Sequence, residues 1–415
     1  MSTSPKTLGE AFTTISPDEE KYEFSLLAPR EALADPSVRL QWESFLRRRD
    51  PLYRVFATPT LYEHQCQTSP KPENQVAVIR DGADRIVGIC PIIFWRLTLP
   101  FQLRRRVLAR ITLRAATILG GEPLAHPEPA LYRCLFKGLL QQLPWCDCVY
   151  LNSIPADGFA SRFLVETCGR TDHNLIYPSQ LERRDFIYHL FGSSFDEFLL
   201  GKQKRTRNTL KRRVRKLKEH GQGVLECCRI QTPDQVEDFY PAALSIAERS
   251  WQSQCLGRSL EETALHRESL MSAAKLGCLR AYLLKCGGQP CAFVIGYQDG
   301  DVLQFEQTAY SQKWHQFSPG TVLYYLLMQD LYEHGRPNLL NFGVGINPHK
   351  RLFSNRNSFD TTFFVLRPTL RNRLRMASYN GFCGGLKLAR RLLKKGLTVE
   401  EADDGESDDP SVPLT

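Results

Sequence analysis

The sequence predicts an α/β (α+β) protein built of two tandem domains, each a mixed sheet flanked by helices. With 415 residues, the chain is longer than one ordinary domain. Its content of 42% hydrophobic and 24% charged residues is typical of a soluble globular protein. In addition, one order of elements occurs twice at a spacing of roughly 200 residues, which is too long for a solenoid repeat and indicates a duplicated domain.

The repeated order is strand, turn, strand, loop, helix and closing strand. The turn signals are Asp81-Gly82 in the first copy and Gly287-Gly288 in the second. The first copy has predicted strands at 76–80 and 86–94, followed by a polar and basic stretch up to Ile118. A glycine loop to Gly121, a helix over 129–143 and a strand over 148–151 complete it. The second has predicted strands at 279–284, 291–297 and 302–308, a polar loop, a helix over 319–334 and a strand over 339–342.

These patterns divide the chain into five segments. We expect a flexible leader (1–22), an N-terminal domain (23–180), a C-terminal domain (181–366), a basic helical segment (367–398) and an acidic disordered tail (399–415). Because residues 400–409 hold seven acids and no base, and the whole chain carries a net +9, the remainder carries +16. A basic body favours polyanionic partners such as nucleic acid, an anionic membrane or a phosphorylated small molecule.

Several classes of protein are disfavoured by composition. No run of about 18 apolar residues is present, so we expect no transmembrane segment. The polar N-terminus lacks the apolar run of a signal peptide, so we expect the protein in the cytoplasm. The basic segment 367–398 is expected to be a terminal helix docked on the protein, and the alternative is an amphipathic segment that lies on the inner membrane face. The 13 cysteines show no C-x-x-C spacing, which predicts no metal site.

A strongly basic helix is predicted over 195–220. Lys202–Lys218 contains ten bases and no acid, while Leu210, Val214 and Leu217 form an apolar stripe. Gly221 is expected to end the helix in a left-handed cap. The pattern is typical of either a solvated surface helix or a helix that contacts a phosphate-bearing polyanion.

The segment Ser318-Pro319-Gly320 predicts an anion site at a helix start. Ser318 is a preferred N-cap, and Pro319 suits the first helical position. The amides of Gly320, Thr321 and Val322 are expected to lack helical partners and to lie at the positive end of the helix dipole. A diphosphate fits such a site.

A second turn-rich stretch, Leu340–Phe353, follows the closing strand. Together, the two stretches resemble the CelD-like acetyltransferase family of the GNAT superfamily. The matching residues are Ala309-Tyr310, Ser318-Pro319-Gly320 and Leu323 in the first stretch, and Asn341-Phe342-Gly343, Gly345 and His349-Lys350 in the second. The basic pattern Arg207–Leu217 is similar to the start of that domain. With the upstream copy, the resemblance covers residues 25–365. Two positions depart from the family pattern, because Asn341 stands where Asp is usual and His349 where Tyr is usual.

The resemblance implies transfer from acyl-CoA, acetyl-CoA in the simplest case, to an amine or hydroxyl by direct attack. Ser318, Gly320 and Thr321 would hold the pyrophosphate, and a backbone amide near Gln307 or Thr308 would polarise the thioester carbonyl. No metal is implied, and the acceptor stays open among an amino sugar, a polysaccharide, a peptide and a lipid amine.

Glu306 is the candidate general base, because its apolar neighbours on the strand 302–308 would raise its basicity. A carboxylate on the solvent face of that strand is the alternative. His349 and Lys350 are candidates for contact with the acceptor or a CoA phosphate.

Two other functions stay open. Transferases similar to the FemAB family use aminoacyl-tRNA on the same fold, in which case the basic helix would bind the tRNA. A non-catalytic nucleic-acid-binding protein that uses residues 202–218 is the remaining alternative.

Overall fold

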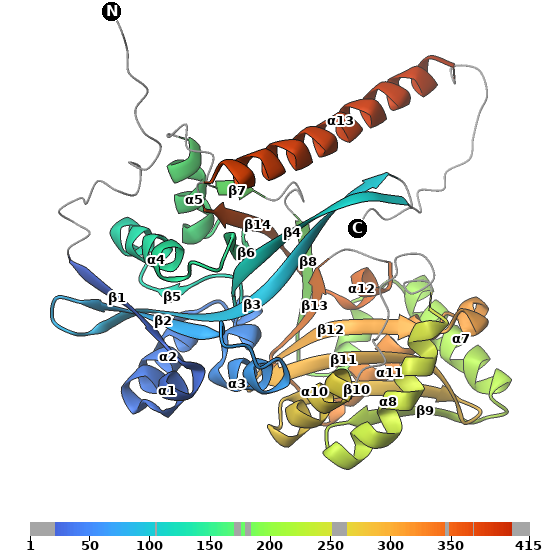
Figure 1. The fold of residues 1–415 in the computed structure, drawn as a ribbon. Helices are drawn as coiled ribbons and strands as arrows, with labels where there is room; N and C mark the ends of the chain where they lie inside the picture. Colours follow the sequence, from blue (N-terminus) through green and yellow to red (C-terminus); the bar gives the residue numbers. More distant parts are fainter. Residues whose placement is uncertain are drawn as a thin grey trace, which may run out of the picture.

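A computed structural model describes residues 21–103, 106–169, 176–178, 184–250, 264–344, 348–367 and 369–400. Within these residues, fourteen strands form one continuous mixed sheet with helices on both faces (Figure 1). The predicted α/β class is therefore confirmed. The expected acidic tail and most of the expected leader lie outside the described residues.

The N-terminal half forms one side of the sheet. Its elements are β1 (Tyr22–Leu27), α1 (Pro29–Ala34), α2 (Pro36–Arg48), η1 (Pro51–Tyr53), η2 (Val55–Ala57), α3 (Pro59–Thr68), β2 (Gln75–Asp81), β3 (Ile86–Leu103), β4 (Arg106–Ile118), β5 (Leu124–Ala125), α4 (Pro129–Gln142), β6 (Cys148–Pro155), α5 (Phe159–Gly169) and β7 (Ile176–Pro178).

The C-terminal half repeats this order of elements. It contains β8 (Arg184–Leu190), α6 (Phe195–Leu200), α7 (Lys204–His220), β9 (Leu225–Ile230), α8 (Pro233–Glu248), α10 (Ala264–Lys275), β10 (Leu279–Cys286), β11 (Gln289–Asp299), β12 (Val302–Tyr310), η3 (Gln312–Phe317), α11 (Pro319–Glu333), β13 (Leu339–Val344), α12 (Pro348–Phe353), β14 (Arg356–Leu366) and α13 (Leu370–Glu400).

The strand order joins the two halves. It runs β1-β2-β3-β4-β6-β14-β8-β13-β12-β11-β10-β9, so β14 lies between β6 of the first half and β8 of the second. Each half has one parallel pair, β4 with β6 and β12 with β13, and each pair is linked by a helix, α4 or α11. The repeated order of elements seen in the sequence is thus a repeat of topology.

Three local predictions were wrong. The basic stretch before Ile118 is β4, which forms a long hairpin with β3. The expected helix 195–220 is two helices, because α6 ends at Leu200 and α7 starts at Lys204. Gly221 has φ −81° and forms no left-handed cap. Close packing requires the glycine instead, because a Cβ at this position would lie 2.5 Å from the carbonyl oxygen of Val224.

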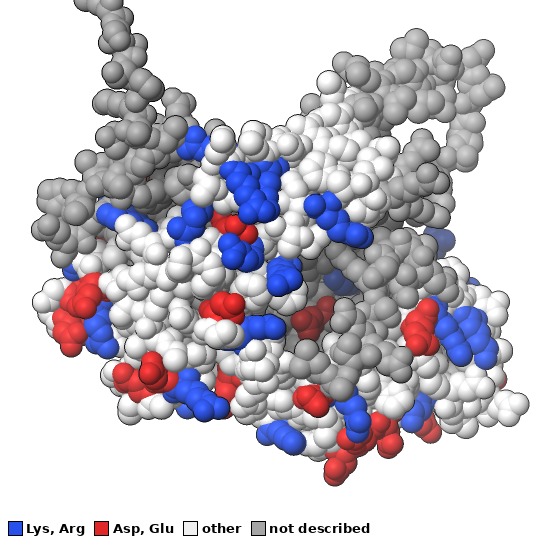
Figure 2. Space-filling view, in the orientation of Figure 1, with Lys and Arg blue, Asp and Glu red and all other residues white. Residues whose placement is uncertain are grey.

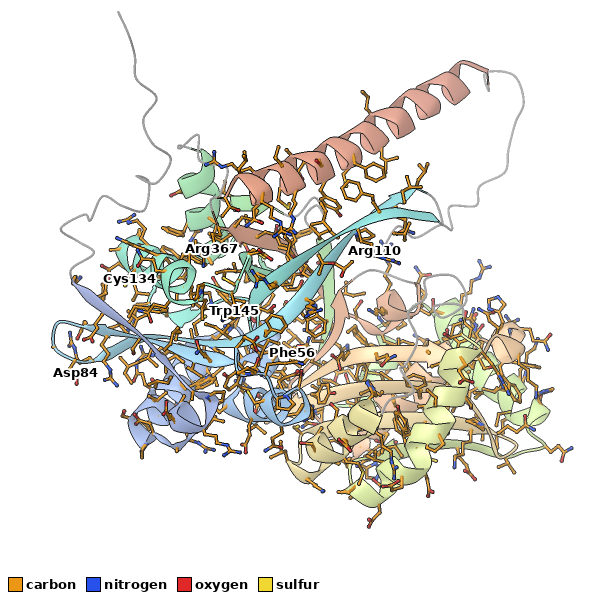
Figure 3. All side chains as sticks on the ribbon, in the orientation of Figure 1. Phe56, Asp84, Arg110, Cys134, Trp145 and Arg367 are labelled. Atoms are coloured by element: carbon orange, nitrogen blue, oxygen red, sulfur yellow. The ribbon has the colours of Figure 1, made fainter. Side chains whose placement is uncertain are left out.

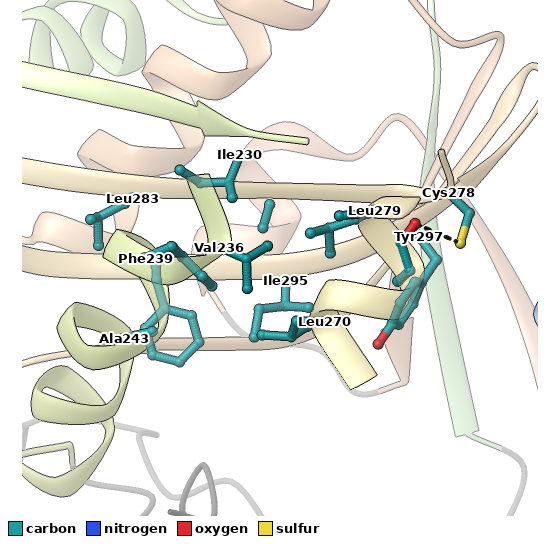
Figure 4. Packing of buried hydrophobic residues seen from close by; sticks show 14 of the residues in the cluster. Ile230, Val236, Phe239, Ala243, Leu270, Cys278, Leu279, Leu283, Ile295 and Tyr297 are labelled. Carbon is teal, nitrogen blue, oxygen red and sulfur yellow. Dashed lines mark hydrogen bonds between the residues drawn. The ribbon is translucent and has the colours of Figure 1, made fainter. Parts of the chain in front are cut away.

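The halves share a hydrophobic core. Leu52, Val55 and Leu61 of the first half pack in one cluster with Phe239 and Ile295 of the second. Figure 4 shows the C-terminal part of this cluster, where α8 and α10 cover the sheet. The two halves are therefore one folded body.

A buried amide reinforces the junction between the halves. Asn341 on β13 is fully buried; its Nδ2 donates to the carbonyl of Leu52 (3.1 Å), and its Oδ1 accepts from the amide of Gly343 (2.7 Å). Only an amide both donates and accepts in this way. Asn at this position, rather than Asp, therefore has a structural reason: a carboxylate here would face the Leu52 carbonyl without a proton to donate.

We predict that Asn341→Asp destabilises the protein by about 3 kcal/mol at neutral pH, because it buries a charge and removes a donor. Urea unfolding followed by fluorescence measures the change. Asn208→Asp, the same substitution at an exposed position on α7, is the control and should cost almost nothing. An Asn341→Asp protein as stable as the control would contradict this account of the junction.

Candidate active site

The parallel pair β12 and β13 separates inside the sheet. Their pairing covers only Val302–Gln304 with Leu339–Asn341, whereas β12 runs on to Tyr310. Beyond Gln304, β12 stays paired with β11 on its other side. No strand among the described residues pairs with β12 beyond Gln304 on this side, which leaves a gap in the backbone pairing where a linear amide-bearing ligand can add hydrogen bonds.

A β-bulge lies at the start of this gap. Ile295 pairs with Gln307 and Gly296 with Phe305, so Glu306 is the extra residue of β12. A bulge changes the direction of a side chain and interrupts the ladder locally. Glu306 is accessible to solvent and lies on the face of the sheet that α8 and α10 cover. Thr308 points to the opposite face, where its hydroxyl donates to the Phe293 carbonyl (3.1 Å).

The start of α11 differs in part from the prediction. Pro319 is the first helical residue, as expected, but Ser318 has φ 54° and ψ 53° and its side chain makes no capping bond. The left-handed turn links η3 to α11 and directs the Ser318 carbonyl at the amides of Thr321 (3.0 Å) and Val322 (3.2 Å). Of the three amides expected to be available, only that of Gly320 has no acceptor among the described residues.

Basic and aromatic side chains surround this helix start. Arg213 of α7 donates from Nη1 to the Thr321 hydroxyl (3.4 Å), which places a guanidinium beside the first turn. A Cβ on Gly320 would meet only the ring of Tyr310, at 3.6 Å. Tyr310 in turn contacts His315 through its hydroxyl and Nδ1 (3.3 Å). The site therefore combines an available amide, a hydroxyl and a cation, which suits an anion.

The carboxyl of Glu306 has a raised pKa. Surrounding protein atoms raise the pKa of its carboxyl, and a hydrogen bond from Tyr297 on β11 partly offsets this effect. Tyr297 is itself buried and is also hydrogen-bonded to Ser269 on α10. The carboxylate is therefore linked to a polar chain that leads away from the gap.

This chain of hydrogen bonds continues into the N-terminal half. The Ser269 hydroxyl contacts Nε2 of His64 on α3 (3.2 Å), and Nδ1 of the same ring contacts the Ser272 hydroxyl (3.3 Å). Ser272 then donates to Oε1 of Gln67 (3.0 Å), which is exposed. His64 is fully buried, and its burial lowers its pKa to about 4, so the ring is neutral near pH 7.

The donors of this chain of hydrogen bonds can be assigned from its outer end, at Gln67. Nε2 of Gln67 donates to Glu63 (3.1 Å), so Oε1 faces Ser272 and accepts its proton. Ser272 must then accept from Nδ1–H of His64, which leaves Nε2 to accept from Ser269.

At the inner end, Ser269 accepts from Tyr297, and the Tyr297 oxygen needs a donor. A protonated Glu306 supplies that donor, so every link has its hydrogen only when Glu306 carries a proton. When Glu306 ionises, Tyr297 turns to it, and four hydrogens remain for five links. If His64 moves its proton from Nδ1 to Nε2 and Ser272 turns to Nδ1, the link that lacks a hydrogen is the outermost one, at exposed Gln67, where water can donate instead.

The remaining predicted residues lie on α12 and β13. Lys350 is 8% exposed, and its burial lowers its pKa to about 8. His349 belongs to the same helix, but its side chain is outside the described part. Asn341 belongs to the junction described above. Glu306, Gln307 and Thr308 lie together on β12, and Ser318, Gly320 and Thr321 lie together at the start of α11.

A cavity of about 320 Å³ lies in the N-terminal half, where β4 and β6 end. Arg48, Arg49, Asp50 and Glu122 are among its polar lining residues, and no predicted site residue lines it. In the repeated topology, the segment after β4, which contains Glu122, corresponds to the segment after β12, which contains η3. The cavity therefore lies at the N-terminal counterpart of the β12–α11 loop.

Comparison with known proteins agrees with this topology. Residues 204–351 match the model of the acetyltransferase (GNAT) domain. FemX is similar in structure, with a TM-score of 0.56, 10% identity, and coverage of 85% of this chain and 99% of that chain. The C-terminal half has the GNAT fold.

Two further structures are less similar. A tandem GNAT protein from the clavulanic acid biosynthesis pathway has a TM-score of 0.49, 13% identity, and coverage of 84% of this chain and 99% of that chain. Saccharomyces cerevisiae N-myristoyltransferase with bound myristoyl-CoA has a TM-score of 0.47, 10% identity, and coverage of 88% of this chain and 83% of that chain. No curated protein sequence matches this chain. The CelD-like branch of the GNAT superfamily stays a prediction.

Four residues of the site were missed by sequence reasoning: Arg213, Tyr297, Ser269 and His64. Arg213 was one base among the ten of a basic helix, with nothing in the pattern to single it out. His64 is more than 200 positions from both of the serines that contact it. No local spacing signal marks such a contact.

We predict that the tautomer of His64 follows the protonation of Glu306. As the pH rises through the raised pKa of Glu306, the ring should change from Nδ1–H to Nε2–H while staying neutral. ¹⁵N NMR of the imidazole nitrogens measures this change, with His64→Gln to assign the signals.

Two variants test the link itself. Glu306→Gln, whose amide donates at every pH, should hold the Nδ1–H form throughout. Tyr297→Phe, which breaks the chain, should make the ring insensitive to Glu306. A wild-type ring that keeps one tautomer while Glu306 titrates would show that the two groups are not coupled.

Proposed function

We propose that this chain is an acyltransferase that transfers an acyl group from acyl-CoA, with acetyl-CoA the simplest donor, to an amine or hydroxyl of an acceptor. The observation that carries the proposal is the separation of β12 from β13 after Gln304, which opens a strand edge leading to the start of α11. The pantetheine arm of CoA contains two amides and suits such an edge. The matched GNAT domain spans both strands.

The diphosphate of the coenzyme binds at the start of α11 in this proposal. The Gly320 amide and the Thr321 hydroxyl donate to it, and Arg213 neutralises part of its charge. Ser318 contributes by its left-handed turn, which shapes the loop, rather than by its hydroxyl.

The reaction is a direct attack on the thioester. A backbone amide of Gln307 or Thr308 polarises the carbonyl, and Glu306 takes the proton of the attacking amine or hydroxyl. The C–S bond then breaks, and CoA leaves as a thiol. Protonation of Glu306 completes the hydrogen-bond chain to His64, which favours the proton's arrival.

Lys350 and His349 are assigned to the acceptor side or to a CoA phosphate. With its pKa lowered to about 8, Lys350 is still mostly protonated near neutral pH, so it can hold an anionic group. The acceptor is an amino sugar, a polysaccharide, a peptide or a lipid amine.

Binding of acetyl-CoA should raise the free energy of unfolding by about 2.7 kcal/mol at a hundredfold excess over its dissociation constant. Differential scanning fluorimetry with acetyl-, succinyl- and long-chain acyl-CoA measures this shift. No shift with any of these thioesters would contradict the proposed donor.

Gly320→Asp separates binding from folding. An acid in the first turn favours the free helix, so the unliganded protein should melt at an equal or higher temperature, while repulsion of the diphosphate should remove the ligand shift. Gly320→Asn is the matched control, because it has the same size without the charge and should retain most of the shift. Equal loss in both variants would indicate a steric effect alone.

The exposed basic face of α7 and the fold similarity to FemX favour one second candidate, transfer from aminoacyl-tRNA. On this alternative, tRNA affinity should fall steeply with salt, and Lys211→Gln, Arg212→Gln and Arg215→Gln should each lower the slope of log K against log salt by about 1. Filter binding at several salt concentrations measures it. A slope near zero, with acyl-CoA binding intact, would exclude this donor.

A further inference from the structure

Two elements form an arm on one side of the protein: the outer part of the β3–β4 hairpin and the helix α13. They pack on each other through Phe101, whose ring lies 5.7 Å from that of Tyr379 and 5.2 Å from that of Phe382. Leu99 and Met376 continue the contact into a small buried cluster. Figure 1 shows the hairpin and α13 extending together away from the body.

The arm exposes an unusual amount of apolar surface. Most of the large apolar side chains that are exposed in the described residues belong to it; they are Trp95, Leu103, Val107, Leu108, Leu370, Leu374 and Leu388. Leu108 is 60% exposed and Leu374 is 59% exposed. The other five are scattered over different elements. A concentration of this kind marks an interaction surface.

The apolar residues of α13 lie on the side opposite its contact with the hairpin. At 100° per residue, Leu370, Leu374 and Leu388 fall within a narrow sector, whereas Met376 and Tyr379 face the other way. The helix therefore has one apolar face buried on the hairpin and a second one exposed to solvent.

The same two elements are strongly basic. Residues 86–118 and 370–399 contain fourteen bases and no acid. Arg96 and Arg114 stand directly opposite each other across the hairpin, a like-charge pair that destabilises a sheet unless an anion lies near. Arg114 has a partner in Asp147. In Figure 3, Arg110 lies on the outer part of the hairpin.

The base of α13 carries two arginines, Arg373 and Arg375. Buried guanidinium nitrogens of Arg373 and Arg375 find no acceptor among the described residues. Figure 2 shows Lys and Arg side chains grouped over the upper middle of this face of the molecule, while acids are more frequent along its lower edge.

We propose that the arm docks on an anionic lipid bilayer, with the exposed leucines in the interface and the bases on the lipid phosphates. Nucleic acid would use the cations but would leave the leucines in water, whereas a bilayer satisfies both. The helix is about 45 Å long and would lie in the plane of the interface. No described helix is long and apolar enough to cross the membrane.

Vesicle sedimentation tests the proposal with the full chain. Wild type should bind phosphatidylcholine vesicles that contain phosphatidylglycerol, should not bind vesicles of phosphatidylcholine alone, and should be released by high salt. Leu108→Gln and Leu374→Gln should each weaken binding about tenfold, because each removes a buried side chain without a change in charge. Arg110→Gln should weaken it about fivefold and lower the salt dependence.

Leu40→Gln on α2 and Leu200→Gln on α6 are matched controls, since both leucines are exposed outside the arm. They should bind as wild type does. Binding of Leu108→Gln and Leu374→Gln at the control level would overturn the proposal, as would equal affinity for neutral vesicles. Tight binding of an RNA duplex that is insensitive to both leucine substitutions, with no binding to vesicles, would assign the arm to nucleic acid instead.

Discussion

The site depends on the early end of the pairing between β12 and β13. A sheet normally satisfies its backbone groups on both sides of each inner strand. Here β12 keeps β11 as its partner but loses β13 after Gln304, so an inner strand acquires a free edge within the body of the protein. The bulge at Glu306 lies at this point and turns the carboxylate to the face covered by α8 and α10, where Tyr297 contacts it. The break in pairing and the bulge thus fall at the same point of β12, which the proposed reaction uses for both the donor and the base.

Local signals predicted the frame of this site. Pro319 begins α11, and Gly335, with φ 80°, follows its end, because the preferences of proline and glycine are properties of the residues themselves. The apolar stretches 279–284 and 302–308 likewise predicted strands that the structure contains. The duplicated order of elements was visible for the same reason, since each copy needs its own turn and its own helix start.

Other features were not predictable because distant residues decide them. Ser318 is a good N-cap by type, yet the end of η3 places it in a left-handed turn where its hydroxyl makes no capping bond. The strand β4 was hidden because its basic residues lie on the exposed face of a projecting hairpin, so no core enforces the usual alternation. The structural role of Asn341 rests on its contact with Leu52, 289 positions away, which no local pattern marks.

The chain of hydrogen bonds from Glu306 gives the N-terminal half a part in the site. A carboxylate that takes up a proton is more basic when its neighbours gain a hydrogen bond at that moment. Tyr297 and Ser269 belong to the C-terminal half, but His64, which can change tautomer without changing charge, comes from α3. The shared core and the Asn341 contact hold α3 against α10 at the separation this chain requires. In the proposed reaction the N-terminal half is therefore more than a duplicated scaffold, because an isolated C-terminal half would lack the imidazole at the end of the hydrogen-bond chain from Glu306.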